Sequence, residues 1–397
     1  MVLSWDEARA AVHAAATPLP TVDVPLAAAD GTVLAGPLTA RTDIPAFDTS
    51  SVDGYAVRGT GPWRLVGKVL AGSVPTAVAD GTAVVLATGA MVPPDTDHVL
   101  RVENTSESAA DGVTLVHGEI PARRDWRDAG EEARCGEELL PAATAVTPGV
   151  IGLAASCGYD TLTVYRRPRV QLLVFGDELL TSGPPRDGRI RDSLGPALPS
   201  WLRRLGADVV GPDVIEPVED TLEAHIAAIE AAAAGAEVVV TTGGTMHGPV
   251  DHLHPALAAL GAEYVVDTVA VRPGFPMLVA RLPDGTWLAG LPGNPQSATV
   301  ALVTLVMPLL ARLRGLPVPP ATRVRLGADI GGRGDFTHLS LVRVEDGLAY
   351  PLTHAGSAML RGVASADGFA VVRPGQHAKA GTETDLVPLP LLAGERT

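Results

Sequence analysis

The sequence predicts a multidomain α/β protein, and three observations support this prediction. The chain has 397 residues, which is too long for one ordinary hydrophobic core. Between Pro168 and Gly315, apolar runs of strand length alternate with runs of helix length, which is the pattern of an α/β sheet. Short strand-like runs between Gly, Pro and Asp turns precede and follow this stretch, and they indicate β-rich regions. We therefore expect an N-terminal region over 1–167 with an inserted β subdomain at about 50–120, a central α/β domain over 168–316 and a C-terminal β domain over 321–397.

The composition is that of a soluble globular protein, with 46% hydrophobic and 19% charged residues. A formal net charge of −15 argues against a nucleic-acid surface, because phosphate backbones require clustered Lys and Arg. An acidic chain can still bind one phosphorylated small molecule through local backbone dipoles. No apolar run of about 18 or more residues lacks polar breaks, so we expect no membrane span.

The first residues and the cysteines indicate a cytoplasmic protein. Residues 1–7 have neither a basic start nor an apolar signal segment. Cys135 and Cys157 are too few for a disulfide framework or a thiolate metal site, so we expect two reduced thiols.

The N-terminal region predicts two short helices around a β-rich insert. A helix over 5–13 ends before Pro18 and Pro20. Residues 43–53, rich in Pro, Asp and Ser, predict a loop that becomes a strand at Tyr55. Further strands are expected at 63–67, 83–87, 98–102, 113–116 and 162–165, and a helix at 150–155.

The central domain predicts alternating strands and helices. Strands are expected at 170–175, 238–242, 264–271, 277–281 and 287–290, and helices at 194–205, 221–234, 252–260 and 297–313. Asp220 or Thr221 is the expected N-cap of the second helix. Residues 317–320 predict a linker, and short strands with Gly-rich turns follow it.

Two turns of the central domain are candidates for anion binding. The strand at 238–242 runs into Gly243, Gly244 and Gly248, and the strand at 287–290 runs into Pro292, Gly293, Asn294 and Pro295. Strand, glycine-rich loop and helix together present backbone N–H groups and a helix N-terminus to an anion. Gly243-Gly244 alone could equally be a tight turn without a ligand.

Acidic residues follow the predicted strands. They are Asp177, Glu178, Asp192 and Asp251. Carboxylates beside a phosphate-binding loop suit Mg²⁺, which takes oxygen ligands and bridges to substrate phosphate. A helix N-cap or a solvated loop is the alternative for each acid, and for Asp192 especially. The spacing of His247, His252 and His254 matches no common zinc site, and the sequence contains no P-loop motif.

A set of motifs along the whole chain resembles the molybdopterin molybdenumtransferase family, of the MoeA and gephyrin E-domain type. The motifs are residues 51–58 (SVDGYAVR), 87–90 (ATGA), 129–132 (AGEE), 176–179 (GDEL), 242–244 (TGG), 272–274 (RPG) and 291–295 (LPGNP). The Asp-Gly-Tyr-Ala and Leu-Pro-Gly-Asn-Pro segments together are highly specific.

The resemblance implies an elongated homodimer of four-part subunits, with a three-layer molybdopterin-binding α/β domain at the centre and a β-barrel-like domain at the end. The implied activity is the Mg²⁺-dependent insertion of molybdate into adenylylated molybdopterin, with release of AMP. It implies that Glu178, Asp192 and Asp251 hold the metal and the pyrophosphate, and that Arg272 is a catalytic cation.

Other site residues follow from the same resemblance. Around the pterin phosphate it places Thr242, Gly243, Gly244, Gly248, Pro292, Gly293, Asn294 and Pro295, and from the last domain Ser357. Asp53, Thr88 and Glu132 are expected to reach this pocket from the neighbouring subunit.

The chain departs from the family pattern at several positions. The usual Lys-Pro-Gly-Lys-Pro is Arg272-Pro273-Gly274-Phe275-Pro276, and Thr268 stands where a basic residue is common. Glu132 and Leu194 replace an Asp and an Asn of the pattern. A non-catalytic scaffold that binds molybdopterin or its cofactor is therefore the alternative to the insertase, and a nucleotide-pyrophosphate hydrolase is a third possibility.

Overall fold

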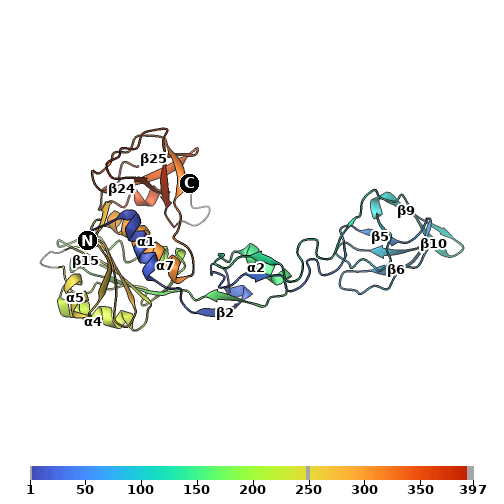
Figure 1. The fold of residues 1–397 in the computed structure, drawn as a ribbon, viewed down its shortest axis with the longest axis horizontal. Coiled ribbons are helices and arrows are strands. Elements are labelled where there is room, and N and C mark those ends of the chain that lie inside the picture. The colour runs from blue at the N-terminus through green and yellow to red at the C-terminus, as the bar shows by residue number, and fades with distance from the viewer. Residues whose placement is uncertain (1, 247–250, 391–397) are drawn as a thin grey trace. The chain divides into compact units, whose positions relative to one another are not determined.

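The computed structural model describes residues 2–246 and 251–390, which form two compact units (Figure 1). The larger unit contains the described residues of Met1–Val22, Gly31–Ala35 and Val164–Thr397, and the smaller contains Asp23–Asp30 and Gly36–Thr163. Strands β2 (Thr21–Pro25) and β13 (Thr161–Tyr165) form a two-stranded sheet.

The larger unit contains the predicted α/β domain, built on a six-stranded sheet of order β17-β14-β18-β22-β21-β19. The strands are β14 (Arg169–Val174), β17 (Asp208–Val210), β18 (Val238–Thr242), β19 (Glu263–Asp267), β21 (Leu278–Arg281) and β22 (Trp287–Leu291). The first four strands in this order are parallel, and β21 and β19 each run antiparallel to their neighbour. The sheet is therefore mixed, with four parallel strands on one side and the antiparallel pairings of β21 and β19 on the other.

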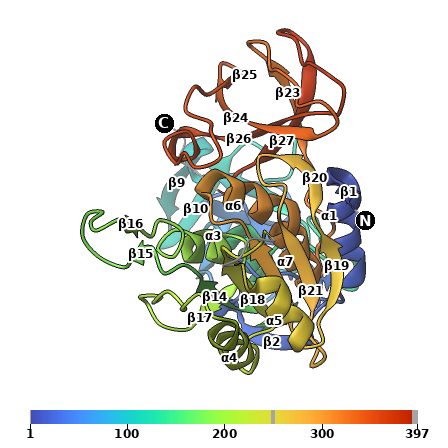
Figure 2. The same cartoon turned by 90° about the vertical axis from the view of Figure 1, so that its left-hand side faces the viewer.

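Successive strand residues face opposite sides of the sheet, which makes three layers (Figure 2). Leu172 and Val174 pack into a core with helices α1, α3, α6 and α7, whereas Leu173 packs into a second core with α4 and α5. These helices are α1 (Trp5–Ala15), α3 (Leu198–Arg204), α4 (Leu222–Ala233), α5 (Leu253–Ala259), α6 (Pro295–Ala301) and α7 (Met307–Leu313). The N-cap of α4 is Thr221, whose hydroxyl accepts a hydrogen bond from the Ala224 N–H.

The structure corrects three of the predicted elements. The strand predicted at 264–271 is two strands, β19 and β20 (Val269–Arg272), because Thr268 takes a positive φ of 72° that interrupts extended backbone. The helix predicted at 194–205 begins only at Leu198, with Pro199 in its first turn. The helix predicted at 297–313 contains a π-helical turn, η3 (Leu302–Val306), between α6 and α7.

Helix Pro295–Leu313 is also long and apolar enough to cross a membrane by length and composition, which the sequence expectation did not anticipate. In the fold, however, 94% of its 18-residue window is buried inside the chain. Apolar composition on all sides is typical of a helix at the centre of a core.

Helix α1 holds the π-helical turn through two polar side chains one turn apart. Trp5 Nε1 donates to Thr304 Oγ1 at 3.0 Å, and Arg9 donates to the carbonyls of Val303 at 2.6 Å and Pro319 at 2.8 Å. A π turn shifts the backbone hydrogen-bond pattern, and here Arg9 binds one of its carbonyls. Burial lowers the pKa of Arg9 to about 10, so the guanidinium stays charged at neutral pH.

The C-terminal part of the larger unit is a closed barrel. Five strands pair in the ring β24-β25-β23-β27-β26 and back to β24. They are β23 (Thr322–Leu326), β24 (Thr337–Glu345), β25 (Leu348–Pro351), β26 (Gly368–Val372) and β27 (Glu383–Pro388). Strands β20 and β1 (Leu3–Ser4) extend this sheet beyond β24. The predicted C-terminal β domain is therefore barrel-like.

The smaller unit is mainly a six-stranded sheet of order β8-β5-β7-β6-β10-β9. Its strands are β5 (Gly54–Val57), β6 (Trp63–Val69), β7 (Thr82–Leu86), β8 (His98–Arg101), β9 (Thr105–Ala110) and β10 (Val113–Gly118). The pairs β3 (Leu38–Thr39) with β12 (Glu138–Leu140) and β4 (Thr49–Ser50) with β11 (Trp126–Arg127), and the helix α2 (Pro148–Ser156), complete it. The β-rich insert is confirmed.

The fold class predicted from sequence is thus confirmed, whereas the predicted boundaries of the three parts stay a prediction. Helix α1 shows why a boundary is difficult to place: its Trp5, Ala8 and Val12 belong to the core of the central sheet.

We expect Arg9→Met to lower the free energy of unfolding of the larger unit by about 2–4 kcal/mol, because the buried Val303 carbonyl and the half-buried Pro319 carbonyl lose a charged donor. Circular dichroism at 222 nm during urea unfolding reports on this unit, since of the described α-helices only α2 lies in the other. Arg203→Met, at an exposed position of α3, is the control. A midpoint for Arg9→Met equal to that of the control would contradict the role assigned to Arg9.

Candidate functional site

The register of three neighbouring strands brings their carboxyl ends to one level. Val174 of β14 lies opposite Thr242 of β18, and Thr242 lies opposite Leu291 of β22. The segments that follow, 175–178, 243–246 and 292–294, therefore start side by side. In open α/β sheets this edge is where ligands bind.

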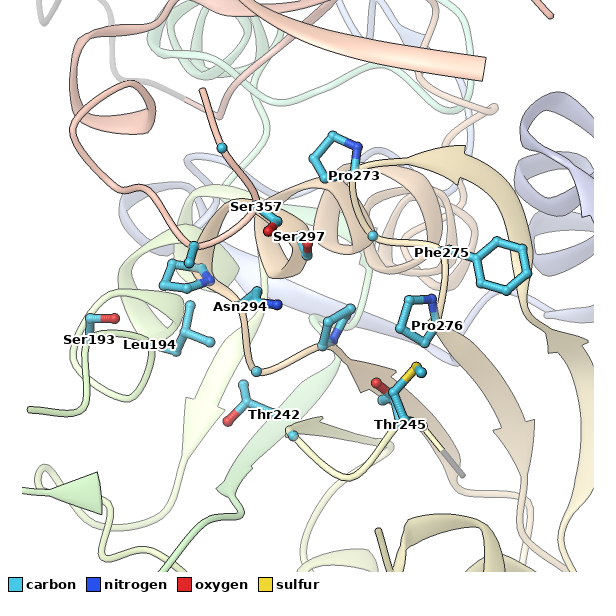
Figure 3. Close-up of a pocket in the computed structure, with 18 of the residues that line it drawn as sticks. Ser193, Leu194, Thr242, Thr245, Pro273, Phe275, Pro276, Asn294, Ser297 and Ser357 are labelled. Atoms are coloured by element: carbon cyan, nitrogen blue, oxygen red, sulfur yellow. The ribbon is translucent and has the colours of Figure 1, made fainter. Parts of the chain in front are cut away.

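A cavity of about 1390 Å³ lies over this edge, between the central sheet and the barrel of the larger unit (Figure 3). Its lining includes the predicted residues Glu178, Asp192, Thr242, Gly243, Gly244, Asp251, Arg272, Pro292, Gly293, Asn294, Pro295 and Ser357. Gly248 lies outside the described residues. The volume is large enough for a nucleotide-sized ligand.

The Gly243-Gly244 turn needs glycine for both steric and conformational reasons. The two residues have φ values of 88° and 65°. Residues that carry a side chain rarely adopt such positive φ values. A Cβ on Gly243 would also lie 2.9 Å from the carbonyl oxygen of Phe175. The turn therefore packs directly against the neighbouring strand end.

The helix N-terminus at 295 offers fewer free donors than the sequence suggests. The N–H groups of Gln296 and Ser297 both approach the carbonyl oxygen of Ser357, at 2.9 and 3.3 Å. The buried Gln296 amide, with its nitrogen facing these carbonyls, donates to Gly356 at 2.8 Å and Ala355 at 3.2 Å. These bonds fix segment 355–357 of the barrel against α6, and they bring Ser357 into the pocket lining.

The three predicted metal ligands, Glu178, Asp192 and Asp251, all line the cavity. The surroundings of their carboxylates differ. Asp192 is buried, and its carboxylate accepts hydrogen bonds from the N–H groups of Leu194 at 2.9 Å and Gly195 at 3.0 Å. These bonds close the turn after Asp192, whereas the N-cap of α3 is Ala197, so Asp192 is neither a helix N-cap nor a solvated loop residue. Glu178 lies over Gly176, where a Cβ would be 2.6 Å from its Oε2. Within residues 2–246 and 251–390, no group of three His, Cys, Asp or Glu is arranged to hold a metal ion.

Several cationic and aromatic residues of the pocket were missed from sequence. Arg191, Arg333, Phe336 and His338 line it together with Arg272. Strand β20 pairs with β24 so that Arg272 lies opposite His338, which brings the last domain to the predicted site. No local sequence pattern predicts the pairing of β20 with β24. Thr268 is not among the described residues that line the cavity.

The three site residues predicted to act from a second subunit lie in the smaller unit. Asp53 and Thr88 are brought together: the Thr88 N–H and hydroxyl donate to Asp53 Oδ1 at 2.7 and 2.8 Å. These bonds lower the pKa of Asp53, so its exposed carboxylate is ionised at neutral pH. Glu132 pairs with Arg127 at 3.1 Å.

A buried histidine lies beneath the glycine turn. His225 is fully buried, its Nδ1 is 2.8 Å from the Thr221 carbonyl, and its ring lies 3.8 Å from that of Phe175. Among the described residues its Nε2 has no hydrogen-bond partner. Burial lowers the pKa of His225, although Thr221 and Asp220 favour its charged form.

Together, the fold and the site define an α/β protein with a large cavity, lined by glycine turns, acids and arginines, at the carboxyl edge of its sheet. Three family models match the chain: the MoeA N-terminal region (domain I and II) at residues 3–158, a probable molybdopterin binding domain at 171–312 and the MoeA C-terminal region (domain IV) at 323–389.

Curated relatives agree with these models. The chain is 32% identical to the molybdopterin molybdenumtransferase of Synechococcus elongatus, over 97% of this chain and 99% of the relative. It is 34% identical to molybdopterin molybdenumtransferase 2 of Mycobacterium tuberculosis, over 75% of this chain and 76% of the relative. The crystal structure of a molybdopterin biosynthesis MoeA protein from Pyrococcus horikosii matches with a TM-score of 0.80 and 26% identity, over 98% and 99% of the two chains. The chain belongs to the molybdopterin molybdenumtransferase family.

Buried His225 should make the larger unit less stable in acid. Its pKa in the folded chain is below the ordinary value of 6.5, so below that pH the unfolded chain binds a proton that the folded chain does not. The free energy of unfolding therefore decreases as the pH falls through 6.5 towards the folded value. We expect the thermal midpoint at 222 nm to fall less between pH 7.5 and pH 5.5 in His225→Phe than in the wild type. An equal fall in the two proteins would contradict this.

Proposed function

We propose that this protein inserts molybdate into adenylylated molybdopterin and releases AMP, as a Mg²⁺-dependent step of molybdenum cofactor biosynthesis. The relatives named molybdopterin molybdenumtransferase support this activity. The observation that carries the proposal is the single cavity in which both glycine-containing turns, four acids and three arginines meet. The cytoplasmic location expected from sequence is part of the same proposal.

The residues of the cavity suit a substrate with two kinds of anionic group. At the turns of Gly243-Gly244 and Pro292-Gly293, the backbone can approach a pterin phosphate closely because no side chain intervenes. Arg272 and Arg333 offer planar, permanently charged groups to phosphate or molybdate oxygens. The reacting groups are thereby held together, which favours transfer by proximity.

Glu178 and Asp251 fit Mg²⁺, because this ion usually takes one or two carboxylates, several waters and the phosphate oxygens of a substrate. A complete cage of three acids is not required for such binding. Asp192 contributes one further carboxylate, which also caps its own turn. When bound, Mg²⁺ would neutralise charge on the pyrophosphate and polarise the phosphoryl group that is cleaved.

The reaction itself tests the proposal. Purified protein is incubated with adenylylated molybdopterin, Mg²⁺ and molybdate, and AMP and active cofactor are measured. AMP together with cofactor supports the insertase. Binding without AMP release would indicate the scaffold, and AMP without metal insertion would indicate a hydrolase.

Asp251→Asn should reduce AMP release by about 100-fold or more, since even outer-shell partners of a metal contribute about 10- to 100-fold. The rate should recover partly as Mg²⁺ is raised, because the lost charge weakens binding of the ion. Asp213→Asn, at an exposed position outside the pocket lining, is the matched control. Wild-type turnover in Asp251→Asn would remove Asp251 from the site.

We also propose that the protein acts as a homodimer in which Asp53, Thr88 and Glu132 of one copy complete the pocket of the other. The support is chemical: Thr88 holds the Asp53 carboxylate ionised on an exposed surface, at a position matching the family motif. Such a group is suited to act on a ligand or metal that a second copy presents.

Complementation between two inactive variants tests this arrangement. Asp53→Asn and Asp251→Asn are co-expressed with different tags, and the doubly tagged dimer is compared with each variant alone. In a two-fold symmetric dimer with shared sites, the doubly tagged dimer should show about half of wild-type activity, because one of its two sites is intact. No recovery would place both acids in the same subunit's site.

A further inference from the structure

Arg272 packs against two aromatic rings at the pocket. Its guanidinium carbon lies 5.0 Å from the centre of the Phe275 ring and 4.5 Å from that of Phe336. The two rings meet edge to face, 5.6 Å apart at 82°. All three residues line the cavity, and in Figure 3 the Phe275 ring lies to one side of Asn294, Ser297 and Ser357.

The fold brings these residues together from two distant segments. Arg272 ends β20, and Phe275 follows in the turn at Gly274, where φ is 98°. Phe336 immediately precedes β24, two residues before His338, the partner of Arg272 across the strands. Side chains two residues apart share one face of a strand, so Phe336 lies on the side of Arg272. A backbone bridge between Arg333 and Phe336 closes the turn that presents the ring.

A guanidinium packed against two rings is suited to bind an oxyanion. Arginine is planar and weakly hydrated, so it can stack on an aromatic face while its edge N–H groups remain directed outward. Arg272 is exposed, and the rings are half-buried, so without them the long side chain would sample many rotamers. Fixing the side chain before the anion arrives reduces the entropy lost on binding.

We propose that Phe275 and Phe336 are positioning residues that orient Arg272 to bind molybdate. The proposal rests on the proposed function for the identity of the anion. Phe275 has no charge with which to bind an anion itself, and its ring contacts the residue that does. Phe275, which stands where the family pattern has a lysine, thus changes how the anion is bound.

The test is a calorimetric titration of the full-length protein with molybdate, which needs no turnover. Phe336→Ala and Phe336→Leu should each weaken molybdate binding about 3- to 10-fold, because neither keeps a ring over Arg272. Phe336→Tyr keeps the ring and should bind within about twofold of the wild type. Tyr350→Leu, which removes an exposed aromatic side chain of the same barrel, is the control and should bind as the wild type. Melting curves at 222 nm confirm that each variant is folded.

Two results would overturn the proposal. One is unchanged molybdate affinity in both Phe336→Ala and Phe336→Leu. The other is weaker binding of adenylylated molybdopterin with molybdate binding intact, which would mean that the rings stack on the pterin. Failure of the proposed function appears separately, as absence of AMP release by the wild type in the reaction assay, while the titration still decides the role of the rings.

Discussion

The register of β14, β18 and β22 is the constraint on which the site depends. Each of these strands is buried on both faces, with alternate residues in two different cores. A shift of one residue would exchange the two faces of a strand and disrupt both cores. The three carboxyl ends are therefore fixed at one level by packing alone. The packing of the whole sheet thus determines where the loops after β14, β18 and β22 begin.

The cavity needs the barrel as well as the sheet, and two features join them. The positive φ of Thr268 ends β19, and the chain then continues as β20 in the barrel sheet. The Ser357 carbonyl accepts from the first N–H groups of α6, which would otherwise face the pocket. Because one wall comes from each part, the cavity would lose Arg333, Phe336 and Ser357 without the last domain.

Sequence reasoning predicted the features that local patterns encode. Alternating strands and helices predicted the α/β sheet, and the residues after β14, β18 and β22 predicted one wall of the pocket. The features that depend on tertiary contacts were not predicted. The break at Thr268 requires a backbone conformation that β-branched residues rarely adopt. The pairing of Arg272 with His338 joins segments about 65 residues apart, and the capping of α6 by Ser357 is a backbone contact with no sequence signature.

The distribution of charge explains how an acidic chain can bind anions. The protein carries a net charge of −15, and the cavity itself contains four acids, so a strongly hydrated lysine would gain little from a general field. Arginine depends less on that field, because its planar donors recognise an oxyanion by geometry as well as by charge. The same acids disfavour an anion unless a cation accompanies it, which supports the proposed requirement for Mg²⁺. Arg272, packed against its two rings, and the carboxylates of the cavity are therefore complementary parts of the proposed site, in which each anionic group of the substrate would meet a cation.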